Sequence, residues 1–222
     1  MSTGLLIGII ILLLVVGVPL VQAIIRWVQR RRSLGVEGVA SLHAAGLRSE
    51  DLPMGLSAQE RAAVTSEEIA LADDDPQTRI RDLDDTGRVI GYREVFRDPR
   101  SWGEFADWLL AQSLHRRRAH RRVEVELTRY GSAEQASASL DVSPPAQMGV
   151  DDIRISEAGE RGGVKAREWT RLEAGETVQR MLELRFTIGD VLAVVRGDSE
   201  PVGALSDDDV WSLAEAVRGR LR

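Results

Sequence analysis

The most concentrated chemistry in this sequence is a run of basic side chains, HRRRAHRR, at residues 115–122. Guanidinium groups bind phosphates and carboxylates, often through two hydrogen bonds at once. Three interpretations remain open: a solvent-facing helix end that pairs loosely with the chain's own acids, a contact with anionic lipid headgroups, or a contact with an acidic partner. The residues that would make an anionic-surface contact are Arg116, Arg117, Arg118, Arg121 and Arg122. Nucleic acid is an unfavoured partner, because the run contains no aromatic side chains and the net charge of the chain is -6.

Acidic side chains dominate residues 50–85, and the densest groups are Asp73–Asp75 and Asp82–Asp85. The segment from Asp82 to Gly87 opens with the oxygen spacing of a calcium loop. The twelfth position is Arg93, however, where such a loop needs a bidentate glutamate. We therefore interpret the segment as a solvated acidic turn before a strand, and we predict no metal site.

Motifs for catalysis or cofactor binding are missing from the sequence. It contains no cysteine and three histidines, His43, His115 and His120. It also contains no nucleophile elbow, phosphate-binding loop or dinucleotide fingerprint. We therefore predict no catalytic or cofactor-binding residue. The alternative is a hydrolase or transferase whose site is assembled from dispersed Asp, Glu and His side chains.

A membrane anchor is expected at the amino terminus, where Leu5–Ile25 contains one polar side chain, Gln22. A helix over these residues is about 31 Å long and matches a hydrocarbon core of about 30 Å. The competing interpretation is a cleaved signal, but the residues before the run carry no basic side chain. The expected interface anchors are Arg26, Trp27, Arg30, Arg31 and Arg32.

The arginines after the span favour a single-pass topology with the amino terminus outside and the large domain in the cytoplasm. An extracytoplasmic domain is the alternative. The spacing of Gly4 and Gly8 allows a homodimer through close helix packing, although ordinary lipid packing explains these glycines equally simply.

The sequence divides into an anchor with its basic flank at residues 1–32, a juxtamembrane connector at 33–64 and a folded domain at 65–222. Inside the domain, four helix starts share a Ser or Thr followed three residues later by an acid or amide. They are Thr65/Glu68, Ser101/Glu104, Ser132/Gln135 and Ser206/Asp209. The helix from Ser101 is expected to end in the arginine run.

Strands are predicted between these helices, and period-2 alternation identifies those at 122–130 and 181–188. The predicted strands cover residues 88–96, 122–130, 152–156, 165–172, 181–188 and 191–195, and Gly189-Asp190 forms a tight hairpin between the last two. This order predicts an α+β domain with an antiparallel sheet of five or six strands and helices packed on one face.

Several short segments resemble a known group of domains. They are Asp51-Leu52-Pro53, GRVIGY at 87–92, RYGSAEQASASL at 129–140, LELRFTIGDVLAVV at 182–195 and the last helix. They look like the small α+β, sensor-like or lipoprotein-like domains of uncharacterised, singly membrane-anchored proteins of high-GC Gram-positive and related bacteria. The resemblance implies a role in binding, offers no shared catalytic motif and implies an outward-facing domain.

Taken together, these patterns predict a single-pass membrane protein whose α+β domain binds a ligand or partner without transforming it. A membrane-surface assembly factor that acts through the basic run is the second hypothesis, and the dispersed-site enzyme is the third.

Overall fold

The computed structural model describes residues 38–71, 73–98, 120–141, 153–173, 176–200 and 203–222. The expected membrane helix Leu5–Ile25, the anchors between Arg26 and Arg32, and the pair Gly4 and Gly8 lie outside these residues. Within the part that is described, no helix is both long and apolar enough to span a bilayer. Membrane anchoring therefore stays a prediction.

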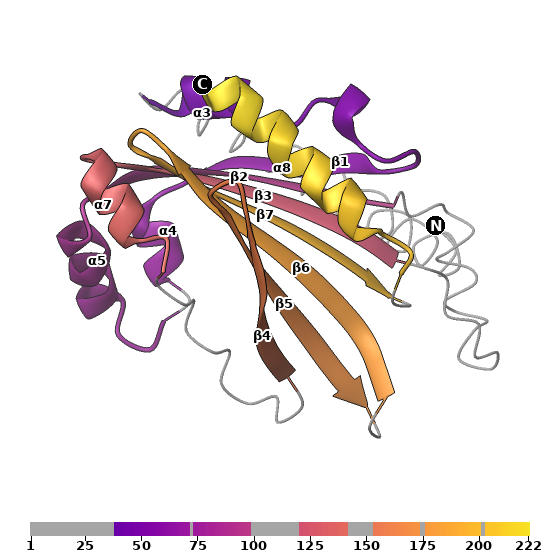
Figure 1. Cartoon of the computed structure of the whole chain (residues 1–222). Helices are drawn as coiled ribbons and strands as arrows, with labels where there is room; N and C mark the ends of the chain where they lie inside the picture. The colour runs from indigo at the N-terminus through magenta and orange to yellow at the C-terminus, as the bar shows by residue number, and fades with distance from the viewer. Residues whose placement is uncertain (1–37, 72, 99–119, 142–152, 174–175, 201–202) are drawn as a thin grey trace, which may run out of the picture.

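The domain is built on one antiparallel sheet of seven strands in the order β1-β2-β3-β7-β6-β5-β4 (Figure 1). The strands are β1 Ser57–Val64, β2 Arg88–Arg97, β3 His120–Tyr130, β4 Ile153–Arg161, β5 Val164–Glu173, β6 Glu176–Ile188 and β7 Val191–Glu200. The predicted α+β class and antiparallel pairing are confirmed, and so is the hairpin at Gly189, where φ is 57°. The sheet has one strand more than the five or six expected.

The additional strand is β1, which lies within the connector predicted at residues 33–64. Residues from 39 onward instead form α3 Val39–Ala45, the 3-10 turn η2 Ser49–Asp51 and β1. The buried Glu94 fastens this region to β2. Its carboxylate accepts a hydrogen bond from the Leu47 amide at 2.8 Å and lies 3.1 Å from Arg61 Nε. β1 was not predicted from the sequence because its exposed Gln59 and Glu60 interrupt any apolar alternation.

The described helices after α3 are α4 Ser66–Ala70, α5 Pro76–Asp85, α7 Ala133–Ala138 and α8 Asp207–Leu221. Three of the described helices, α4, α7 and α8, begin at predicted capping residues, whereas α3 and α5 were not predicted. Thr65 and Ser206 complete capping boxes with Glu68 and Asp209, and Ser132 accepts a hydrogen bond from the Gln135 amide. The start at Ser101 lies outside the described residues.

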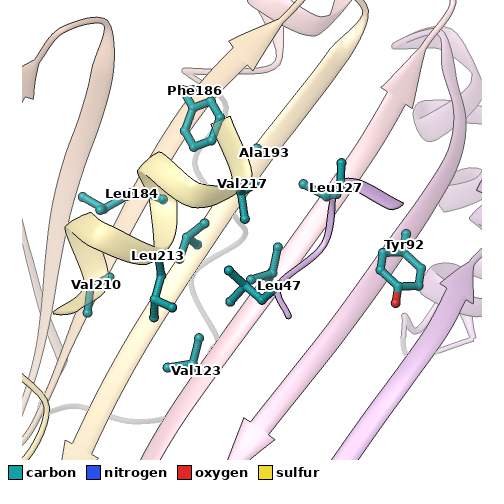
Figure 2. Packing of buried hydrophobic residues seen from close by; sticks show 14 of the residues in the cluster. Leu47, Tyr92, Val123, Leu127, Leu184, Phe186, Ala193, Val210, Leu213 and Val217 are labelled. Carbon is teal, nitrogen blue, oxygen red and sulfur yellow. The ribbon is translucent and has the colours of Figure 1, made fainter. Parts of the chain in front are cut away.

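The main core lies between one face of the sheet and α8, with α3 beside the C-terminal end of that helix (Figure 1). Val210, Leu213 and Val217 of α8 point at strand residues such as Leu184 and Phe186 (Figure 2). All five are at most 2% exposed. Burying each such side chain contributes about 1.5–3 kcal/mol, so this interface is a main source of stability.

The prediction that all helices pack on one face of the sheet is wrong, because α7 lies on the face opposite α8. Ala136 of α7 packs with Tyr130, Leu192 and Val194, whose side chains point away from α8. The short helix therefore covers one end of the second face. The rest of that face carries the residues described next.

Candidate binding face

The face of the sheet opposite α8 carries a row of charged side chains that alternate in sign. Direct cross-strand partners share a face of a sheet, so the register defines the row. It runs over β3, β7, β6, β5 and β4 as Glu124, Arg196, Glu183, Arg167 and Glu157. We call these five residues the charged row. Each strand contributes one member, and every neighbour has the opposite charge.

Hydrogen bonds join most of the charged row. Arg196 donates from Nε to Glu183 at 2.7 Å and from a terminal nitrogen to Glu124 at 3.3 Å. At the far end of the row, Arg167 Nε donates to Glu157 at 3.1 Å. Glu183 is 1% exposed and Arg167 8% exposed, whereas the Glu157 side chain is 70% exposed. The centre of the row is therefore largely removed from water, while its β4 end is open.

Glu124 is the most heavily shared carboxylate on this face. Arg93 of β2 donates to both its oxygens at 3.0 and 3.1 Å, and Arg122 and Arg196 also donate to it. Burial by itself raises the pKa of Glu124, but the hydrogen bonds and charge of Arg93 and the charges of Arg122 and Arg196 hold it below its ordinary value. Three guanidiniums thus compete for one carboxylate.

Arg185 links the charged row to α7. It donates to the Ser139 carbonyl at the end of α7 at 3.1 Å, and its Nε lies 4.0 Å from Glu183 Oε1. Burial lowers the pKa of the Arg185 guanidinium; the Glu183 charge opposes this shift, and the Arg167 and Arg196 charges add to it. Among the described residues, Glu183 Oε1 accepts no hydrogen bond. Positive charge is therefore concentrated around a single buried acid.

A second row lies beside the charged row, two residues further along each strand. It consists of Arg97, Arg122, Asp198, Met181, Trp169 and Ile155, which lie opposite one another in the order β2-β3-β7-β6-β5-β4. We call these six residues the outer row. It is cationic at its β2 end and apolar at its β4 end. Between these ends, burial raises the pKa of Asp198, although the charges of Arg122 and Arg97 oppose the shift.

The structure separates the residues of the predicted basic contact. Arg121 points to the α8 side of the sheet, where it binds Asp98 at 2.6 Å and donates to the Met54 carbonyl at 2.9 Å. Arg122 lies on the opposite face beside Glu124. Both belong to β3, so the strand predicted from Arg122 is confirmed, whereas a helix end that includes residues 120 and 121 is wrong. Arg116, Arg117 and Arg118 lie outside the described residues, and their lipid contact stays a prediction.

The acids and histidines proposed for other chemistry lie apart from this face or outside the description. Asp82–Asp85 close α5 and do not form the expected turn, and Asp75 caps that helix through the Thr78 amide. The His43 ring packs edge-on against Tyr92 at 5.4 Å on the α3 side. In the described ranges, no three His, Asp or Glu side chains are grouped as a metal site. The side chain of His120 is not among those described, and His115 lies outside the described ranges.

Sequence reasoning missed both rows although it identified most of their strands. The alternation predicted that Glu124, Glu183 and Arg185 occupy the polar sides of strands. Their meeting depends on the register between strands up to some 70 residues apart, such as Glu124 and Arg196. The one available signal was the mixture of acids and arginines at alternating positions in β3, β6 and β7.

Comparison with known proteins supports the fold. No family model matches the sequence, and no curated protein matches it. The structure resembles the crystal structure of the extracellular domain of PknH from Mycobacterium tuberculosis, with a TM-score of 0.51 and 10% sequence identity. The match covers 81% of this chain and 93% of that chain. At this identity the likeness shows the fold alone, and it agrees in part with the expected resemblance to sensor-like domains of high-GC Gram-positive bacteria.

Proposed function

We propose that this chain is a non-enzymatic, sensor-like binding domain tethered to a membrane by Leu5–Ile25, and that its ligand surface is the face bearing the charged and outer rows. The observation that carries the proposal is the division of the sheet. One face is buried by apolar packing against α8 and α3, whereas the other carries guanidinium and carboxylate groups across all the central strands. The resemblance to the extracellular domain of PknH supports the sensor-like part of this proposal.

A purely structural role explains this face less well. Removing charges from water costs several kcal/mol per ion, and a cross-strand pair returns only about 0.2–1 kcal/mol relative to small side chains. Replacing buried ion pairs by well-packed apolar side chains of similar volume is often neutral or stabilising. Oriented guanidiniums that share too few carboxylates are, in contrast, suited to recognising a ligand with anionic groups.

The binding proposal is tested with the full chain in nanodiscs. Hydrogen exchange is measured with and without candidate metabolites and peptides that stabilise the chain in thermal melts. Protection of β5, β6 and β7, lost in Arg167→Gln but kept in Arg48→Gln on the other side of the molecule, supports the proposal. Protection confined to α3 and α8 would overturn it, as would turnover of a bound substrate.

The side of the membrane is a separate part of the proposal. The arginines after Ile25 favour a cytoplasmic domain, whereas the extracellular PknH domain favours the outside. Reporter fusions after Arg222 and protease digestion of spheroplasts separate the two. A domain digested in intact spheroplasts would contradict the cytoplasmic topology and leave the binding face unaffected.

A further inference from the structure

The outer row has a chemical polarity that the charged row lacks. Arg97 and Arg122 are direct cross-strand partners with the same charge, an arrangement that disfavours strand pairing. Arg97 is exposed and forms no ion pair with any described residue, and the Arg122 side chain is 33% exposed. Both cations are therefore accessible to an anion, which would also relieve their repulsion.

The other end of the outer row is apolar and open to solvent. Met181 and Trp169 are half-buried, and Ile155 is 49% exposed on the edge strand β4. Adjacent strands lie about 4.8 Å apart, so these three side chains form a strip about 10 Å long. With the same spacing between strands, Arg122 lies two strands from Met181 and four strands, or about 19 Å, from Ile155.

Polar residues border this strip on both sides where it crosses β6 and β5. The charged row runs along one side with Glu183, Arg167 and Glu157, and Gln179 and Arg171 lie on the other. The strip is therefore one side chain wide on β6 and β5, and on β4 the apolar Ile153 lies beside Ile155. A single alkyl chain can lie along this strip, but the strip offers no broad apolar area to a protein surface or to a two-chain lipid.

We propose that the outer row binds a single-chain anionic amphiphile, with its carboxylate or phosphate head between Arg97 and Arg122 and its alkyl chain along Met181, Trp169 and Ile155. This inference rests on the proposed function, because it names the ligand class of the same face. Asp198 lies between head and tail, flanked by Arg122 on β3 and Met181 on β6.

The test uses the full chain in nanodiscs of zwitterionic lipid and a dodecanoate analogue with a diazirine at the tail. After illumination, mass spectrometry is expected to place the label on peptides of β5 and β6 that contain Trp169 or Met181, the part of the strip that a dodecyl chain can reach from the head site, and excess dodecanoate should compete. Loss of two charge-assisted contacts in Arg97→Gln/Arg122→Gln is expected to reduce this labelling by about tenfold or more. The matched control Arg154→Gln removes a cation from the other face of β4 and should retain it.

Three outcomes would overturn the proposal: labelling unaffected by the double substitution, equal labelling by the neutral dodecanol analogue, or label spread evenly over the α8 face. Arg97→Gln alone guards against misfolding, because its exposed side chain contributes no described ion pair. If a hydrophilic ligand protects β5–β7 from exchange while the amphiphile does not label them, the proposed function stands and this inference fails. If ligands protect only the α8 face, the proposed function fails as well.

Discussion

The two faces of the sheet are made by the same strands but obey different physics. On the α8 face, Leu184 and Leu213 lie among apolar neighbours, and contact is favourable whatever its direction. On the opposite face, Glu183 and Arg196 are held by directional hydrogen bonds that must offset lost hydration. The first face can stabilise the fold without recognising anything, whereas the second carries groups able to select a ligand.

The largest effect expected from breaking this contrast is on the α8 face. Leu213 is 1% exposed, so Leu213→Ala should lower the free energy of unfolding by about 2–5 kcal/mol through lost burial and the cavity left behind. Urea denaturation of the full chain in nanodiscs, followed by circular dichroism, measures it. The control Leu71→Ala changes a side chain that is 77% exposed and should alter stability by no more than about 0.5 kcal/mol. Equal losses for both variants would show that α8 packing does not dominate stability.

On the charged face a smaller loss is expected from Glu183→Ala. The substitution leaves Arg196 and Arg185 without their shared carboxylate, and we expect a cost of about 2 kcal/mol because the Arg196 side chain keeps 22% of its surface in water. Glu157→Ala removes the exposed end of the same row and should cost no more than about 1 kcal/mol. Thermal melts and denaturant titrations compare the two. A larger loss for Glu157→Ala would contradict the burial gradient along the row.

The smallest effects, on pH dependence, should have opposite signs for two acids of this face. Because the pKa of Glu124 is lowered in the fold, its contribution is present above its ordinary value of 4.5 and is lost as the pH falls through the folded pKa. Because the pKa of Asp198 is raised, its contribution is present below 3.8 and is lost as the pH rises through the folded pKa.

Denaturation midpoints from neutral pH down to about pH 3 measure both effects. Glu124→Gln should be destabilising at neutral pH, with its deficit shrinking in acid. Asp198→Asn should be neutral or stabilising at neutral pH and lose that advantage in acid. Parallel curves for the two variants would mean that the arginines of this face do not distinguish its carboxylates.

Much of the architecture was accessible from local patterns. The capping residues Thr65, Ser132 and Ser206 mark three helix starts because a cap depends on four consecutive residues. The alternation around Val125 and Leu184 identifies strands for the same local reason. β1 escaped detection because an edge strand with few apolar residues has no such alternation, and its place in the sheet depends on pairing with β2 and on the ion pair between Arg61 and the distant Glu94.

The same distinction holds for the candidate site. Of the predicted contact residues that the structure describes, Arg121 and Arg122 lie on opposite faces, because neighbouring residues of a strand point in opposite directions. The prediction of one anionic-surface contact in the basic run had placed them together. The rows, in contrast, bring together residues that no local pattern connects.

The sequence by itself determined an α+β domain, the positions of six strands, and the polar and apolar sides of the strands at 122–130 and 181–188. These properties follow from side-chain periods of a few residues. Only the tertiary structure decided that Glu124, Arg196, Glu183, Arg167 and Glu157 line up, and that Arg97 and Arg122 share one end of a row with an apolar strip at the other. The physical reason is register: a shift of one residue in any strand would send its charges into the core, so the buried face fixes what the charged face presents.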